Sequence, residues 1–109
     1  MKPLTFLGDS RERLRAFPDA AREATGRQLL RVQLGGDPLD WKPLAAVGPG
    51  VREVRVRTEA GAFRTVYLAA LADRVLVLHA FQKKTRATPK RDIELAAKRL
   101  RAWRAGHGG

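Results

Sequence analysis

The sequence predicts an α+β domain in which a small, mainly antiparallel four-stranded sheet is combined with two N-terminal helices and one C-terminal helix. Two patterns predict this class. Strand-like segments follow one another between residues 51 and 82 with only short turns between them, which requires antiparallel hairpins. Apolar residues then recur at helical spacing towards the C-terminus. The 109 residues suffice for one domain, which we expect to span 1–105, with a flexible tail at 106–109.

The first part of the chain predicts one strand and two helices. A short strand is expected from Lys2 to Leu7. Asp9 followed by Glu12 forms a capping pair, which predicts the start of a short helix. Pro18 restarts the chain into a second helix, expected over about 19–34, and the glycines that follow end it.

Residues 35–50 are rich in Gly and Pro and are expected to form a loop. A connection of this length is uncommon in a small domain unless it binds something or covers an edge of the core. Trp41 and Lys42 stand out within it. One interpretation is a base-stacking tryptophan beside a phosphate-binding lysine; the other, which we favour, is a tryptophan that covers the core.

Three strands are expected after this loop. In the first, VREVRVRT, Val54 and Val56 share one face while Glu53, Arg55 and Arg57 share the other, the alternation of a half-buried strand. The second strand is FRTVYLA. The third, RVLVLHAFQ, is apolar on both faces, which predicts an interior strand that is covered on both sides.

Thr88 and Pro89 predict the start of the last helix, because a threonine hydroxyl can cap free N–H groups and proline suits the first helical position. The helix is expected to end near Arg104. Its apolar residues share the face that should pack against the sheet. They are Ile93, Ala96, Ala97, Leu100 and Trp103.

The charge balance indicates a polyanionic partner. Lys and Arg total 22 against 11 for Asp and Glu, so the formal net charge is +11. Such an excess repels itself in the folded state and is typical of proteins that bind nucleic acid. The alternative is a solvated basic surface that serves solubility alone.

Several classes of function can be excluded. The absence of cysteine removes disulfides, thiolate nucleophiles and the usual zinc sites. Ser10 is the only serine, and His79 and His107 are the only histidines, so a catalytic triad or a histidine metal site is not expected. We therefore expect no metal and no cofactor. Without an apolar segment of membrane-spanning length or a signal peptide, the chain is expected to be cytoplasmic and to bind no membrane.

Cations are expected to converge at one end of the sheet. Arg64 lies in an otherwise apolar strand, so either a carboxylate meets it or the strand faces a polar groove there. If the hairpins pair in simple order, Arg57 and the cations of the turn after residue 82 approach it. That turn carries Lys83, Lys84 and Arg86. Fixed cations aimed at one point stabilise the charge of a phosphorane-like transition state, although each cation taken singly is more simply a surface or ion-paired side chain.

Two blocks, GVREVRVRTEAGAFRTVYLA and VLVLHAFQKKTRATPKRDIELAAKR, resemble the HigB/RelE superfamily, the toxins of bacterial type II toxin–antitoxin systems. The chain is most similar to the phage-derived, HigB-like branch, which PLDWKPL and VGPGVRE also resemble. The similarity covers nearly the whole chain, and HAFQKKT with TPKRDIELA is its most specific part. The resemblance implies a compact RelE-like fold.

The resemblance also implies an activity, which is ribosome-dependent cleavage of messenger RNA without a metal. In this superfamily the ribose 2′-hydroxyl attacks the adjacent phosphate and leaves a cyclic phosphate. By position, Arg64 is expected to stabilise the transition state, and Lys83 and Lys84 to grip the phosphate or assist proton transfer. RelE-type members carry a tyrosine where this chain has Lys90, so His79 or a lysine is the candidate acid or base.

Further cations are expected to bind RNA. They are Lys42, Arg55, Arg57, Arg86 and Lys90. As partners, the resemblance implies messenger RNA on the ribosome and a helix-turn-helix antitoxin, whose complex with the toxin binds operator DNA. Two other functions stay open, which are a non-catalytic RNA- or ribosome-binding module of the same fold and a DNA-binding regulator that acts with a partner. His79 lies inside an apolar strand, where a core histidine is the simpler interpretation.

Overall fold

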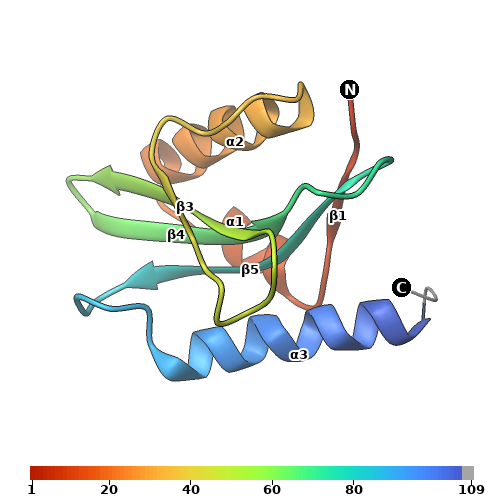
Figure 1. The fold of residues 1–109 in the computed structure, drawn as a ribbon. Helices are drawn as coiled ribbons and strands as arrows, with labels where there is room; N and C mark the ends of the chain where they lie inside the picture. Colours follow the sequence, from red (N-terminus) through yellow and green to blue (C-terminus); the bar gives the residue numbers. More distant parts are fainter. Residues whose placement is uncertain (107–109) are drawn as a thin grey trace.

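In the computed structural model, which describes residues 1–106, a sheet lies between helices on its two faces (Figure 1). The helices α1 and α2 cover one face, and α3 crosses the other. In chain order the elements are β1 (Leu4–Phe6), α1 (Ser10–Arg15), α2 (Asp19–Gln33), β2 (Trp41–Pro43), β3 (Val51–Thr58), β4 (Gly61–Leu68), β5 (Val75–Lys83) and α3 (Lys90–Gly106). The predicted α+β class is confirmed.

The strand order across the sheet is β1-β5-β4-β3-β2. The strands β3, β4 and β5 form the consecutive antiparallel meander that the short turns predict, and β1 pairs in parallel with β5. The sheet has five strands rather than the expected four, because Trp41–Pro43 pairs with β3 as an edge strand. Three residues show no alternation that a sequence could reveal, and an edge position tolerates the proline.

Two hydrophobic cores lie on the two faces of the sheet. On one face, Leu14, Phe17 and residues of α2 pack on β3, β4 and β5. On the other face, Ala96, Ala97 and Leu100 of α3 are buried, with Ile93 and Trp103 partly buried beside them. The apolar face predicted for the last helix is thereby confirmed.

The ends of the helices differ in detail from expectation. Asp9 precedes α1, but its side chain makes no capping bond, because the carboxylate pairs with Arg13 and Arg99. Gly106 is the last residue of α3 rather than the first of the expected tail, and residues 107–109 lie outside the described residues. None of the helices within 1–106 combines the length and the apolar character that crossing a membrane requires.

One irregularity in β5 matters for the site. Val66 pairs with His79 and Tyr67 pairs with Val77, so Leu78 is an extra residue without a partner in β4. Such a bulge bends the strand and re-aims the side chains that follow it. Leu78 belongs to the core under α3, and His79 contacts Asp92 of α3, so two consecutive side chains face the same helix.

Candidate functional site

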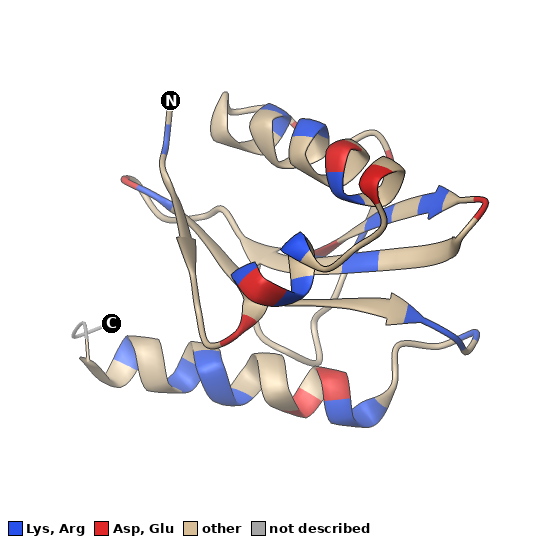
Figure 2. Ribbon diagram, turned by 180° about the vertical axis from the view of Figure 1, so that it is seen from behind, with Lys and Arg blue, Asp and Glu red and all other residues tan. Residues whose placement is uncertain are grey.

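Six cationic side chains line one groove of about 550 Å³ at the end of the sheet, which we call the cationic groove. They are Arg55, Arg57, Arg64, Lys83, Lys84 and Arg86. Figure 2 shows the corresponding blue segments of β3, β4 and the loop after β5 at the same end of the sheet. No Asp or Glu is among the described residues that line the groove. The structure therefore brings together the cations whose convergence the sequence predicted.

The register of the meander places these side chains on one face. Arg55 of β3 lies opposite Arg64 of β4. Two residues before Arg64, Ala62 lies opposite Lys83 of β5. Residues two apart along a strand share a face, so Arg55, Arg57, Arg64 and Lys83 all point to the side of α3. Like charges directly opposite each other on a sheet are unfavourable, so this arrangement needs a compensating anion.

Glu53 supplies that anion. Its side chain is fully buried, and its Oε1 lies 3.3 Å from Nε of Arg64, which is 4% exposed. Nη1 of Arg64 also donates a hydrogen bond to the carbonyl of Phe63, at 3.1 Å. Burial lowers the pKa of Arg64 and the charge of Glu53 opposes this effect. Both alternatives predicted for Arg64 are thus realised, since a carboxylate meets it and its strand face opens into a groove.

Glu53 has two further partners. Thr88, in the loop before α3, donates its hydroxyl to Oε2 at 2.7 Å. Lys42 of β2 places Nζ 3.8 Å from Oε1. Sequence reasoning assigned Glu53 to a polar face and gave it no role. The available signal was a lone acidic residue in an otherwise basic strand.

The cations at the mouth of the groove are open to a ligand. Arg57, Lys84 and Arg86 are exposed and Lys83 is partly exposed. Within residues 1–106, none of these four is among the side chains that form an ion pair with a carboxylate. Partial burial and the charges of Arg64 and Lys42 lower the pKa of Lys83. A lowered pKa favours proton transfer by this lysine.

Two of the expected RNA-binding residues lie outside the groove. Lys42 reaches Glu53 from β2, while Lys90 is exposed at the start of α3 and lies 3.7 Å from Glu94. Trp41 belongs to neither core, so the favoured interpretation of a core lid is wrong. The Arg52 guanidinium covers the Trp41 ring, 3.9 Å from its centroid.

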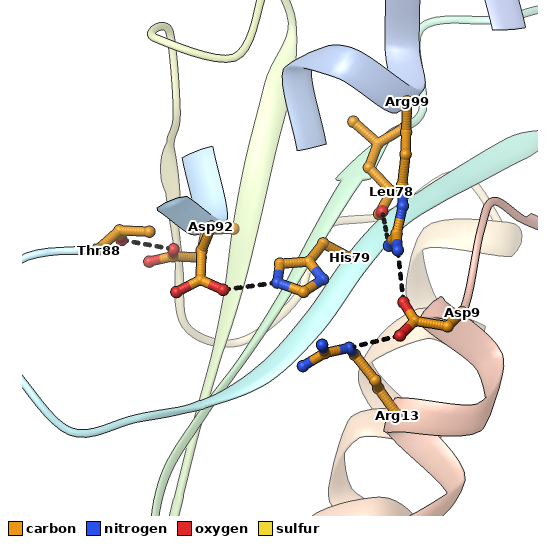
Figure 3. A network of polar contacts seen from close by, with 8 residues as sticks. Asp9, Arg13, Leu78, His79, Thr88, Asp92 and Arg99 are labelled. Carbon is orange, nitrogen blue, oxygen red and sulfur yellow. Dashed lines mark hydrogen bonds and ion pairs between the residues drawn. The ribbon is translucent and has the colours of Figure 1, made fainter. Parts of the chain in front are cut away.

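His79 is fully buried and does not line the groove. Its Nε2 lies 2.7 Å from Oδ1 of Asp92 (Figure 3). Its ring also stacks on that of Phe81. Burial lowers the pKa of His79, against the effect of Asp92. This placement agrees with the favoured interpretation of a core histidine. The candidate role as an acid or base stays a prediction. His107 lies outside the described residues.

A second polar network joins α1, β5 and α3 (Figure 3). The Asp9 carboxylate accepts bonds from Arg13, at 2.9 Å, and from Arg99, at 2.5 Å. Arg99 also donates to the carbonyl of Leu78, the bulge residue. Hydrogen bonds from Arg13 and Arg99 lower the pKa of Asp9 to about 2. This network holds the helices against β5 without entering the groove.

The family model described as Phage derived protein Gp49-like (DUF891) matches residues 12–101, a range that contains every residue of the cationic groove. No curated protein matches the sequence at a significant level. The match confirms the phage-derived character that the resemblance indicates, and it covers most of the chain. The chain therefore belongs to the Gp49-like family of phage-derived proteins.

Proposed function

We propose that the protein is the toxin component of a toxin–antitoxin system, an endoribonuclease that cleaves messenger RNA on the ribosome. The observation that supports this proposal most is the cationic groove, in which six Lys and Arg side chains meet without an acidic residue in the lining. Membership of a phage-derived family and the sequence resemblance to HigB/RelE toxins agree with it.

In the proposed reaction the ribose 2′-oxygen bonds to the adjacent phosphorus, and the bond from phosphorus to the 5′-oxygen breaks. A base accepts the proton of the 2′-hydroxyl, and an acid supplies a proton to the leaving 5′-oxygen. Arg64, held by Glu53, donates to the phosphate oxygens on which charge develops. Lys83 is our candidate for proton transfer because its pKa is lowered, and Lys84 neutralises the phosphate.

The remaining cations are proposed to bind the RNA backbone. Arg55, Arg57 and Arg86 line the groove, whereas Lys42 lies on β2 and Lys90 at the start of α3. Contacts to phosphates give affinity with little sequence preference, and sequence is then read elsewhere. We propose a helix-turn-helix antitoxin as the protein partner, with operator DNA bound through the complex; the sequence resemblance motivates this part.

One observation favours a second candidate, a non-catalytic RNA- or ribosome-binding module. Among residues 1–106, neither a carboxylate nor a histidine lines the cationic groove, so the candidate acids and bases within this part of the chain are lysines. A module without proton transfer would keep the affinity for RNA and leave the RNA intact.

The test compares cleavage by the wild type and by Arg64→Lys. Lysine keeps a charge next to Glu53 but lacks the planar fork of donors, so the fold should persist while cleavage falls by about 10²–10³-fold. Cleavage of messenger RNA is mapped with purified ribosomes, and the ends are analysed for 2′,3′-cyclic phosphate. Arg101→Ala, at an exposed position of α3, is the control. If the wild type binds messenger RNA but leaves it intact, the nuclease proposal is wrong and the RNA-binding module is favoured.

A further inference from the structure

We infer that Glu53 is a positioning residue of the cationic groove, whose buried carboxylate holds Arg64 and the loop before α3 in one fixed arrangement. The catalytic consequence of this inference rests on the proposed function. The positional part concerns the fold and can be tested without any cleavage.

The partners of Glu53 come from three different elements. Oε1 faces Arg64 of β4 at 3.3 Å and Lys42 of β2 at 3.8 Å, and Oε2 accepts the hydroxyl of Thr88 at 2.7 Å. A buried carboxylate is costly unless it is paired, so the carboxylate keeps all three partners near it. One side chain therefore links the sheet to the loop that leads into α3.

The Thr88 bond is what ties this loop to the sheet. In the part of the chain that the structure describes, the loop after β5 makes two side-chain hydrogen bonds. Thr85 bonds within the loop, to the carbonyl of Ala87, and Thr88 bonds to Glu53. The loop carries Lys84 and Arg86, two of the cations that line the groove. Glu53 thereby holds groove cations on both sides, Arg64 directly and the loop cations through Thr88.

Glu53 itself is not placed to react. It is fully buried and does not line the groove. Its Oε2 accepts a hydrogen bond from Thr88, and its Oε1 faces the cations of Arg64 and Lys42 at ion-pair distance. It acts through the residues that it holds, and its negative charge adds one electrostatic effect. Partial burial and the charges of Arg64, Lys42 and Arg55 lower the pKa of Lys83, whereas Glu53 raises it.

Two variants separate the two links. Glu53→Gln keeps the size of the side chain and an oxygen for Thr88 but removes the charge that faces Arg64. Thr88→Val keeps the shape of the side chain and removes only the donor to Glu53. Displacement of a group in a catalytic site by about 1 Å costs up to about 10²-fold in rate. We expect single-turnover cleavage of ribosome-bound RNA to fall by about 10- to 100-fold in each variant.

Three further readouts distinguish positioning from a general loss of structure. Amide hydrogen exchange of residues 84–88 should accelerate in Thr88→Val, while exchange in the strands stays as in the wild type. The limb of the pH–rate profile that Lys83 controls should move to lower pH in Glu53→Gln, because an effect that raises its pKa is removed. The double variant should be slower than either single variant, because Glu53→Gln keeps an acceptor for Thr88 and each variant therefore breaks a different link.

Glu59→Gln, at an exposed position of the β3–β4 turn, is the matched control and should behave as the wild type. The inference is overturned if Glu53→Gln and Thr88→Val both fold, cleave RNA at the wild-type rate and show the loop exchange of the wild type. If Glu53→Gln does not fold, Thr88→Val alone decides in the same way. If the wild type cleaves no RNA, the proposed function fails, while the hydrogen exchange of the loop still decides whether Glu53 holds it.

Discussion

Replacing Arg64 and Glu53 together should destabilise the protein by less than the sum of the two single losses. The two charged groups lie 3.3 Å apart, and their side chains are 4% and 0% exposed. At an effective dielectric constant of about 20, unit charges at this distance attract by about 5 kcal/mol. Arg64→Met keeps the apolar volume but leaves the carboxylate, within residues 1–106, with Lys42 and Thr88 as its partners. Loss of one member of a buried pair costs about 3–5 kcal/mol in free energy of unfolding.

The double variant Arg64→Met with Glu53→Gln removes both charges and still offers Thr88 an oxygen. We expect it to be more stable than the sum of the single losses predicts, by about 2–3 kcal/mol of coupling. The measurement is urea unfolding followed by tryptophan fluorescence. Arg57→Met, at an exposed position, is the control and should change stability by less than about 0.5 kcal/mol. Simple additivity of the two single losses would refute the coupling that we derive from the buried pair.

Three more outcomes are expected. The affinity for ribosomes or single-stranded RNA should fall with salt, with a log–log slope of about 0.7 for each phosphate contact; a slope near zero in a filter-binding titration would mean that the +11 charge serves solubility alone. Asp9→Asn should lower the free energy of unfolding at pH 7 by about 1–2 kcal/mol, a value reduced for screening because about half of the side chain is exposed. The folded pKa of Asp9, about 2, lies below its unfolded value. The contribution of Asp9 to stability is therefore complete above about pH 4 and is lost as the pH falls towards 2. Stability curves of the wild type and the variant that stay parallel down to pH 2 would contradict this prediction. Gly8→Ala should lower the free energy of unfolding by about 1–2 kcal/mol, because Gly8 has a φ of +55° and a Cβ there would lie 2.3 Å from Nε of Arg99. An unchanged melting temperature in thermal unfolding would show that the loop adapts.

Much of the fold could be predicted because local patterns and tertiary structure agree. The alternation of β3 and the apolar stripe of α3 appear in the structure as the sequence indicates. β2 could not be predicted, because its residues become a strand only through pairing with β3. The capping role of Asp9 failed for a similar reason, since Arg99 lies far away in the sequence and competes for the same carboxylate.

The candidate site was predictable in composition rather than in geometry. The basic turn after β5 and the isolated Arg64 could be found by their charge in apolar surroundings. For Glu53 the signal of a lone acidic residue was too weak, because a glutamate on the same strand face as Arg55 and Arg57 is typical of a solvated surface. Only the register of β4 and the position of Thr88 reveal that this face is covered at Glu53.

The bulge at Leu78 decides on which side of the sheet Lys83 is found. In a regular strand, all odd-numbered residues from Val75 to Lys83 would share one face. Here Val77 packs in the core under α1 and α2, whereas Phe81 packs in the core under α3, because the extra residue reverses the parity of the strand between them. Inserting a second residue between Leu78 and Lys83 would restore the original parity and turn the Lys83 ammonium away from Arg64. Chain length in this segment is thus as strict a requirement for the groove as the lysine itself.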